Sequence, residues 1–137
     1  MHRPGHIDHY IDPNGILFTR VSGDVEESML DELRQFVHDQ AHEVRVLDTA
    51  MGPKLRGIMD LSKIRAYHPD TLKIMIDYCI EVKDYFEKAA TFGATGLVAQ
   101  AQKYVLGKAR WNNVRSFETE AEAVAWVREP DTALTNS

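Results

Sequence analysis

The sequence contains little cysteine and no long apolar run. Cys79 is the single cysteine among 137 residues, which excludes an internal disulfide and fits a reducing compartment. No stretch of about 18 consecutive apolar residues occurs, so we expect no stable membrane insertion. The segment from Met1 to Asp12 is polar, rich in histidine and without the apolar core of a signal peptide. Together these absences predict a cytoplasmic protein.

Positive charge and catalytic motifs are also scarce. The 16 lysines and arginines are outnumbered by 21 aspartates and glutamates, and the formal charge of -5 argues against general nucleic-acid binding. The sequence lacks a Ser-His-Asp order, a phosphate-binding P-loop, a Gly-x-Gly-x-x-Gly turn, a His-Glu-x-x-His helix and paired cysteines. The usual motif evidence for an enzyme is therefore missing, and we predict no catalytic set and no cofactor.

The composition is typical of one soluble globular domain. With 44% apolar and 27% charged residues, the chain is large enough to bury a core without disulfides or metal. We expect a loose N-terminus at residues 1–9, one domain at residues 10–129 and a polar tail at residues 130–137. Within the first segment, His2, His6 and His9 have a spacing that would suit a metal on a helix. A proline and a glycine between them oppose a helix, so we predict no metal site.

The stretch from Leu55 to Pro69 organises the rest of the chain. Its apolar part, Gly57 to Leu61, is too short for a helix and does not alternate, which is typical of a strand buried on both faces of a sheet. A loop is expected from Lys63 to His68. Pro69 then suits the first turn of a long helix, because its missing N–H would be unpaired there anyway.

The chain before this strand predicts a hairpin followed by a helix. Asn14-Gly15 between two apolar runs is a strong signal for an antiparallel hairpin over residues 10–21. Asp24, with Glu27 three residues later, resembles a capping box and predicts a helix that begins there. Apolar residues then recur at helical spacing as far as Val44, which predicts a helix lying on a sheet.

The second half of the chain alternates strands and helices. Short strands are predicted at residues 89–93 and 114–117, with a helix between them. Thr119 with Glu122 makes a capping box for a final helix that stops before Pro130. The order predicts an α/β fold, with a mixed four- to five-stranded sheet, an N-terminal antiparallel hairpin and helices packed on it.

Two motifs resemble those of a known family. Residues 58–62 read Ile-Met-Asp-Leu-Ser, a strand that ends in an Asp-Leu-Ser signature, and residues 115–127 resemble a closing strand and helix. Over roughly residues 10–128 the chain resembles a STAS-like domain, also described as SpoIIAA-like, in its stand-alone bacterial form. The resemblance implies a non-enzymatic binding or regulatory module that acts through a protein partner or a small anionic ligand. Relatives of the fold include lipid-exchange domains, so a carrier of an apolar or lipid-like molecule is the alternative.

One position departs from the family pattern. Anti-sigma-factor antagonists of this family carry a phosphorylated serine in an Asp-Ser-Ser-Gly turn at the start of the helix after the central strand. The equivalent stretch here, Arg65 to Thr71, contains no serine. Thr71 offers a hydroxyl, but Asp70 beside it would repel a phosphate, which argues against a phosphorylation-switched antagonist.

Polar residues gather after the central strand, where ligands bind in open α/β sheets. We predict a ligand-binding cleft at this end of the sheet, with an anion favoured at the Gly96 amide at a helix start. The predicted ligand-binding residues are Asp60, Ser62, Tyr67, His68, Thr95 and Gly96. His68 with Asp60 also leaves a small enzyme open. In the simpler interpretation, His68 is a loop residue and Asp60 hydrogen-bonds neighbouring backbone. The turn before Gly96 is then an ordinary tight turn between a strand and a helix.

The long helix has more apolar surface than one sheet face needs. Its buried stripe is predicted as Leu72, Met75, Ile76, Cys79, Val82 and Phe86, with Cys79 as an inert core thiol. Beside this stripe, the long helix carries a second apolar line. Residues 88–117 hold no acidic residue and include a basic loop. The apolar line and the basic loop predict a surface for a protein partner or a homodimer. The predicted partner-surface residues are Ile74, Tyr78, Tyr85, Arg110 and Trp111. Aromatics lying along the domain's own edge would explain the same pattern.

Overall fold

The computed structural model describes residues 5–51 and 55–130 and contains one mixed sheet with helices on both faces. The strands are β1 (His6–Ile11), β2 (Ile16–Val25), β3 (Leu55–Tyr67), β4 (Phe86–Phe92) and β5 (Val114–Phe117). The helices are α1 (Leu30–Met51), α2 (Asp70–Val82), α3 (Gly96–Ala109) and α4 (Glu120–Arg128). Short 3-10 turns, η1 (Glu27–Met29) and η2 (Lys83–Tyr85), join β2 to α1 and α2 to β4.

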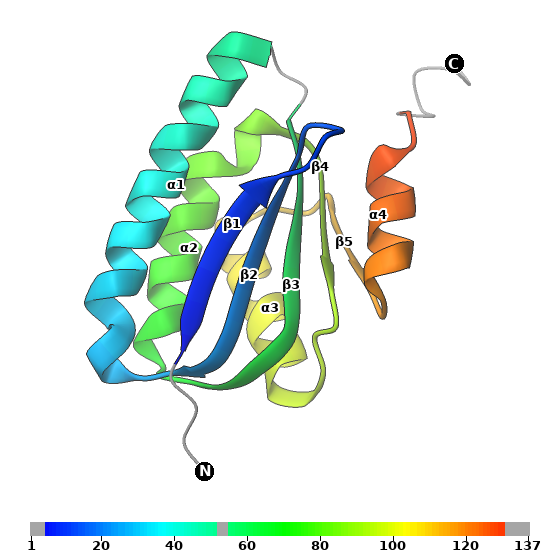
Figure 1. Cartoon of the computed structure of the whole chain (residues 1–137). Helices are drawn as coiled ribbons and strands as arrows, with labels where there is room; N and C mark the ends of the chain where they lie inside the picture. Colours follow the sequence, from blue (N-terminus) through cyan, green and yellow to red (C-terminus); the bar gives the residue numbers. More distant parts are fainter. Residues whose placement is uncertain (1–4, 52–54, 131–137) are drawn as a thin grey trace.

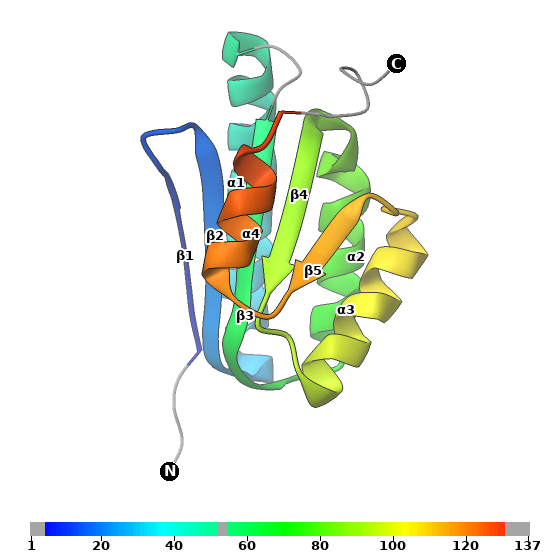
Figure 2. The ribbon, with the colours of Figure 1, turned by 90° about the vertical axis from the view of Figure 1, so that its right-hand side faces the viewer.

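The strands follow one another across the sheet in the order β1-β2-β3-β4-β5. The β1–β2 pair is antiparallel, and the other three pairs are parallel. Helices α1, α2 and α3 cover one face of the sheet, and α4 covers the other (Figures 1 and 2). The predicted fold class, a mixed sheet with an N-terminal antiparallel hairpin, is confirmed.

The period of two along each strand divides the core between the two faces. Leu17 and Leu55 pack with α1, α2 and α3, whereas Ile58 and Phe92 pack with α4. Strand β3 is therefore buried on both faces, as its unbroken apolar run predicts. Leu72 and Met75 on α2 pack on the face of the sheet opposite to Ile58 and Phe92.

The first strand begins at His6, four residues before the predicted strand at Tyr10, so the expectation of a loose segment up to residue 9 is wrong for this part. Pairing with β2 holds this strand, from His6 opposite Ser22 onward. His9 adds a tertiary contact, because its Nε2 lies 2.9 Å from Oε2 of Glu43 on α1. His2 lies outside the described residues.

The paired part of β2 and β3 is longer than predicted. Asp24 is a strand residue paired with Ala66, not a helix cap, and α1 begins only at Leu30. Strand β3 likewise continues to Tyr67, where we expected a loop. Each strand supplies the other's backbone partners, and Gly23, with φ 77°, lies at a register shift that lets the pair bend. Ala50 to Pro53 predict a loop before β3, but α1 continues to Met51, and residues 52–54 lie outside the described residues.

Helix α4 is fixed at both ends. The predicted capping box is confirmed, since the Thr119 hydroxyl accepts from the Glu122 N–H and the Glu122 carboxylate accepts from the Thr119 N–H. At the other end, Lys88 Nζ donates to the carbonyl oxygens of Trp126 at 2.9 Å and Glu129 at 3.0 Å. A cation at the C-terminal carbonyls also offsets the helix dipole. Lys88 thereby holds the C-terminal end of α4 to β4.

Candidate functional site

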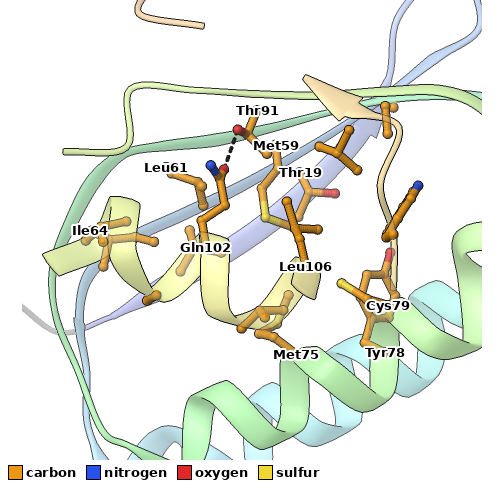
Figure 3. A pocket seen from close by; sticks show the side chains of 18 of the residues that line it. Thr19, Met59, Leu61, Ile64, Met75, Tyr78, Cys79, Thr91, Gln102 and Leu106 are labelled. Atoms are coloured by element: carbon orange, nitrogen blue, oxygen red, sulfur yellow. Dashed lines mark hydrogen bonds between the residues drawn. The ribbon is translucent and has the colours of Figure 1, made fainter. Parts of the chain in front are cut away.

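A cavity of about 160 Å³ lies between the sheet and the three helices on its α1–α3 face (Figure 3). Its walls come from β2, β3 and β4 on one side and from the inner faces of α1, α2 and α3 on the other. Most of the lining is apolar, including Val21, Leu33, Met59, Leu61, Met75 and Leu106. The volume resembles that of an engineered protein cavity of about 150 Å³ that stays dry and binds benzene.

Small side chains leave this space open. Ala89 on β4 and Ala101 on α3 line the cavity from opposite walls and are too short to fill it. Gly57 on β3 also faces it, but the Phe86 ring covers that position, since a Cβ there would lie 2.7 Å from the ring. The bulky residues Met75 and Leu106 form the rim of the remaining space (Figure 3).

Gln40 is a buried polar residue among those that line the cavity. Its side chain, on α1, is only 2% exposed, and its Nε2 donates to Thr19 Oγ1 at 2.7 Å. Among the described residues, Gln40 Oε1 and Thr71 Oγ1 are buried with no hydrogen-bond partner, and both residues line the cavity. A buried polar atom left unpaired costs about 1–3 kcal/mol. Sequence reasoning missed Gln40, although Leu33, Gln40 and Val44 lie on one face of α1 at helical spacing.

Two ionisable residues of the lining remain neutral. Burial raises the pKa of the Cys79 thiol to about 12. Burial also raises the pKa of Tyr78, which is 6% exposed. A neutral thiol is a poor nucleophile, which agrees with the expectation of an inert core residue. The cavity therefore offers contact surface and a few neutral polar groups.

Two of the predicted site residues belong to the opposite face of the sheet. Asp60 is 3% exposed, and its Oδ2 accepts from Arg20 Nε at 2.9 Å. Its Oδ1 accepts from the Ser62 N–H at 2.9 Å and from the Ser62 hydroxyl at 2.6 Å. Arg20 also lies 3.7 Å from Glu120 on α4. Asp60 therefore joins β3 to Arg20 on β2, which in turn reaches Glu120 at the start of α4, and both Asp60 oxygens already accept hydrogen bonds.

These bonds set the pKa of the Asp60 carboxyl. Burial alone would raise the pKa, but hydrogen bonds from Ser62 and from Arg20 outweigh it, so the net pKa lies below its ordinary value. The hydrogen bond to Asp60 in turn raises the pKa of Arg20. The pair remains charged at neutral pH.

Acid should therefore weaken the fold through Asp60. The stabilising contribution of its ionised form is complete above the ordinary carboxyl pKa of about 4 and is lost as the pH falls through the lower folded value. We expect Asp60→Asn to be less stable than the unmodified protein at pH 7 and to lose less stability on acidification. Urea unfolding between pH 7 and pH 3 measures this, with exposed Asp77→Asn as the control. An equal acid slope in Asp60→Asn and the unmodified protein would contradict the assignment.

The remaining predicted residues lie at the carboxyl end of β3 and the starts of α2 and α3. The Tyr67 hydroxyl donates to the Leu97 carbonyl at 3.4 Å, which joins β3 to the first turn of α3, and Tyr67 also lines the cavity. Thr95 is the N-cap residue of α3 without a side-chain cap bond, and Gly96 follows it with φ 54°. His68 holds the start of α2, because its Nδ1 accepts from the Asp70 N–H at 3.1 Å. Anion binding at Gly96 remains a prediction.

The predicted partner surface on α2 is largely buried. Ile74 is 8% and Tyr78 is 6% exposed, so the expectation that they form a free apolar line is wrong. The reason is that α2 lies between α1 and α3 and is covered on both flanks. Tyr85 and Trp111 are partly buried against the same core, and Arg110 is exposed.

Besides Ile80 on α2, which is 51% exposed, apolar side chains are exposed on α3. Leu97 is 72% and Tyr104 is 50% exposed. The helix turns Val105 and Ala109 inward, because these pack with α2 in the core. Lys103 and Lys108 lie on the same exposed helix, and Lys108 Nζ is 5.7 Å from the centre of the Tyr104 ring.

The fold is similar to those of solved STAS-type proteins. An anti-sigma factor antagonist from Mycobacterium paratuberculosis has a TM-score of 0.65 and 17% sequence identity. The match covers 94% of this chain and 100% of that chain. The unphosphorylated form of the anti-sigma factor antagonist SpoIIAA has a TM-score of 0.64 and 12% identity, over 90% and 96%. An uncharacterised protein with a SpoIIAA-like fold from Shewanella loihica PV-4 has a TM-score of 0.55 and 14% identity, over 90% and 93%.

The chain therefore has the STAS, or SpoIIAA-like, fold that its motifs predicted. No protein-family model and no curated protein matches the sequence. Within residues 5–51 and 55–130, no helix combines the length and the apolar character needed to cross a bilayer. The structural likeness defines the fold, and the residues of this chain must supply the function.

Proposed function

We propose that this protein is a non-enzymatic binding module of STAS-like type that takes a small apolar molecule into the cavity between β2–β4 and α1–α3. The observation that carries the proposal is the apolar cavity of about 160 Å³, whose lining also includes the polar residues Thr91 and Gln102. Ligand sites in proteins are mostly apolar and carry a few placed polar groups. This cavity has both properties.

An apolar ligand is better supported than an anionic one. The carboxylate of Asp60 already accepts three hydrogen bonds, from Arg20 and from two donors of Ser62. His68 is occupied at the start of α2. Asp60 and His68, the acid–base pair that an enzyme would need, therefore already form structural hydrogen bonds. The apolar lining of the cavity has no such hydrogen bonds to break when a ligand binds.

A regulatory role follows from which elements the ligand would touch. Val98, Ala101 and Leu106 place the inner face of α3 in the cavity wall, and the outer face of the same helix exposes Leu97 and Tyr104. A molecule in the cavity stabilises the arrangement that binds it, by about 2.7 kcal/mol at a ligand concentration one hundred times the Kd. Occupancy would thus fix the position of a surface suited to a protein partner.

Toluene tests the proposal with a matched pair of variants. Ala101→Leu adds an aliphatic side chain to the cavity wall, whereas Gln100→Leu adds the same side chain to the exposed side of α3. We expect toluene to raise the Tm of the unmodified protein and of Gln100→Leu, and to have much less effect on Ala101→Leu. Scanning calorimetry with and without saturating toluene measures this. Equal shifts in both variants, or no shift in the unmodified protein, would overturn the proposal.

A further inference from the structure

We infer that two copies of this chain associate through β1, whose outer edge pairs with β1 of the second copy as an antiparallel strand. Strand β1 is the first in the order of the sheet, and within residues 5–51 and 55–130 it pairs with β2 alone (Figure 1). This edge is separate from the cavity, whose strand residues come from β2, β3, β4 and β5. It is also separate from the predicted surface on α2, which is largely buried.

The hairpin determines which backbone groups of β1 face outward. Asp12 directly follows β1, and its N–H donates to the Ile16 carbonyl at 3.0 Å. In an antiparallel pair, residues that exchange hydrogen bonds with the partner strand alternate with residues that do not. Counting back from Asp12, every second residue of β1 therefore directs its N–H and C=O to β2. The residues whose backbone groups point away from β2 are Ile7, His9 and Ile11.

The outer edge of β1 lacks the usual protection against strand pairing. Natural proteins protect an edge strand with lysine, proline, a bulge or a very short length. Strand β1 has six residues, contains no lysine or proline, and pairs with β2 without a register shift. Its side chains Tyr10 and Ile11 are 46% and 41% exposed. A regular edge with exposed apolar side chains is a template for another strand.

The sequence of β1 is self-complementary about His9. In a two-fold antiparallel pair, residues at equal distances from the central residue lie opposite each other. A pair centred on His9 therefore places Ile7 of one copy opposite Ile11 of the other, and Asp8 opposite Tyr10. The first two are both apolar, and their backbone groups face each other. In the second pair the tyrosine hydroxyl is a donor and the carboxylate is an acceptor.

The neighbouring registers place like charges together. A pair centred on Asp8 sets the two Asp8 carboxylates opposite each other, and a pair centred on Tyr10 sets Asp8 opposite Asp12. Like charges directly opposite each other are destabilising. The register centred on His9 avoids both contacts. The His9 ring itself is directed to α1, where its Nε2 lies 2.9 Å from Oε2 of Glu43.

Two variants at one position test this register, because both remove the stacking of Tyr10 on Phe18, whose ring centres are 5.0 Å apart. Tyr10→Glu places a carboxylate opposite Asp8 of the second copy, whereas Tyr10→Lys places an ammonium group there. We expect the unmodified protein and Tyr10→Lys to be dimers at high micromolar concentration. The dimer of Tyr10→Glu should dissociate at least about tenfold more readily than that of Tyr10→Lys, because the pair occurs twice in a two-fold dimer. Sedimentation velocity over a range of protein concentrations measures this, and circular dichroism checks that both variants are folded.

Amide hydrogen exchange by NMR locates the interface. We expect the N–H groups of Ile7, His9 and Ile11 to exchange at least about tenfold more slowly in the unmodified dimer than in Tyr10→Glu at the same concentration. The N–H groups of Asp8 and Tyr10 face β2 and are the internal control, with protection in both proteins.

Three results would overturn the inference. A dimer whose outward N–H groups exchange freely associates through another surface. Equal weakening by Tyr10→Glu and Tyr10→Lys contradicts the register centred on His9. A protein that stays monomeric at high micromolar concentration does not pair with itself, and the edge of β1 is then left for a strand of another protein.

Discussion

Replacing Gly93 by alanine should lower the free energy of unfolding by about 2–5 kcal/mol, the sum of backbone strain and overpacking. Gly93 has φ 80°, a conformation that side chains disfavour. An added Cβ would lie 2.4 Å from the Ser62 Cβ and 2.8 Å from its Cα. The second atom is backbone in β3 and cannot swing away. Urea unfolding measures the loss.

Two other glycines separate the causes. Gly96 also has a positive φ, 54°, but an added Cβ would meet nothing within 4 Å. We expect Gly96→Ala to cost about 1 kcal/mol, from the left-handed backbone alone. Gly107 lies within α3 with open space around it, so Gly107→Ala should stabilise by up to about 1 kcal/mol. If Gly93→Ala costs no more than Gly96→Ala, the close approach of β3 to the β4–α3 turn is wrong.

Replacing Leu33 by alanine should destabilise the protein by about 2–5 kcal/mol. Leu33 is 2% exposed and lies both in the core between α1 and β2 and in the cavity wall. The truncation removes buried apolar surface and enlarges the cavity that is already present. We therefore also expect Leu33→Ala to bind a longer probe, propylbenzene, more tightly than the unmodified protein does.

Val46 provides the control for this truncation, because it lies on the same helix and is 53% exposed. Val46→Ala should change the free energy of unfolding by no more than about 0.5 kcal/mol. Urea unfolding measures both variants, and calorimetric titration measures propylbenzene. A stability loss below about 1 kcal/mol in Leu33→Ala would contradict the placement of this residue in the core.

The order of strands and helices could be read from the sequence because its signals are local. Asn14-Gly15 marks the hairpin, and the carboxylate of Asp12 accepts from the N–H groups of Asn14 and Ile16 at 2.9 Å in the observed turn. Thr119 and Glu122 likewise mark the start of α4. Signals of this kind depend on a few neighbouring residues, so tertiary contacts leave them unchanged.

The predicted boundaries around α1 were wrong because residues distant in the sequence determine where β2 and β3 end. Asp24 and Glu27 have the spacing of a capping box, yet pairing of β2 with the second half of β3 keeps Asp24 in a strand. Residues 63–67 read as a loop for the same reason, since their partners lie about forty residues earlier in the chain. Long-range pairing overrides local preference here.

The candidate site was only partly predictable. The end of β3 was correctly expected to meet the start of α3, and the hydrogen bond from Tyr67 to the Leu97 carbonyl makes that contact. Which face a strand residue occupies was harder to predict. Asp60 bonds to Arg20, which reaches Glu120 on α4, while the cavity lies on the other face of the sheet. A cavity arises from small residues on elements distant in sequence, such as Ala89 and Ala101, and no local pattern indicates it.

The presence of an accessible apolar cavity beneath α3 is tested most directly by a crystal structure of the protein under xenon pressure, because xenon enters apolar cavities of this size. We expect xenon between the sheet and the side chains of Met75 and Leu106, and its loss in Ala101→Leu. A structure in which these side chains fill the space, with no xenon between the sheet and α3, would contradict the cavity and the function proposed for it.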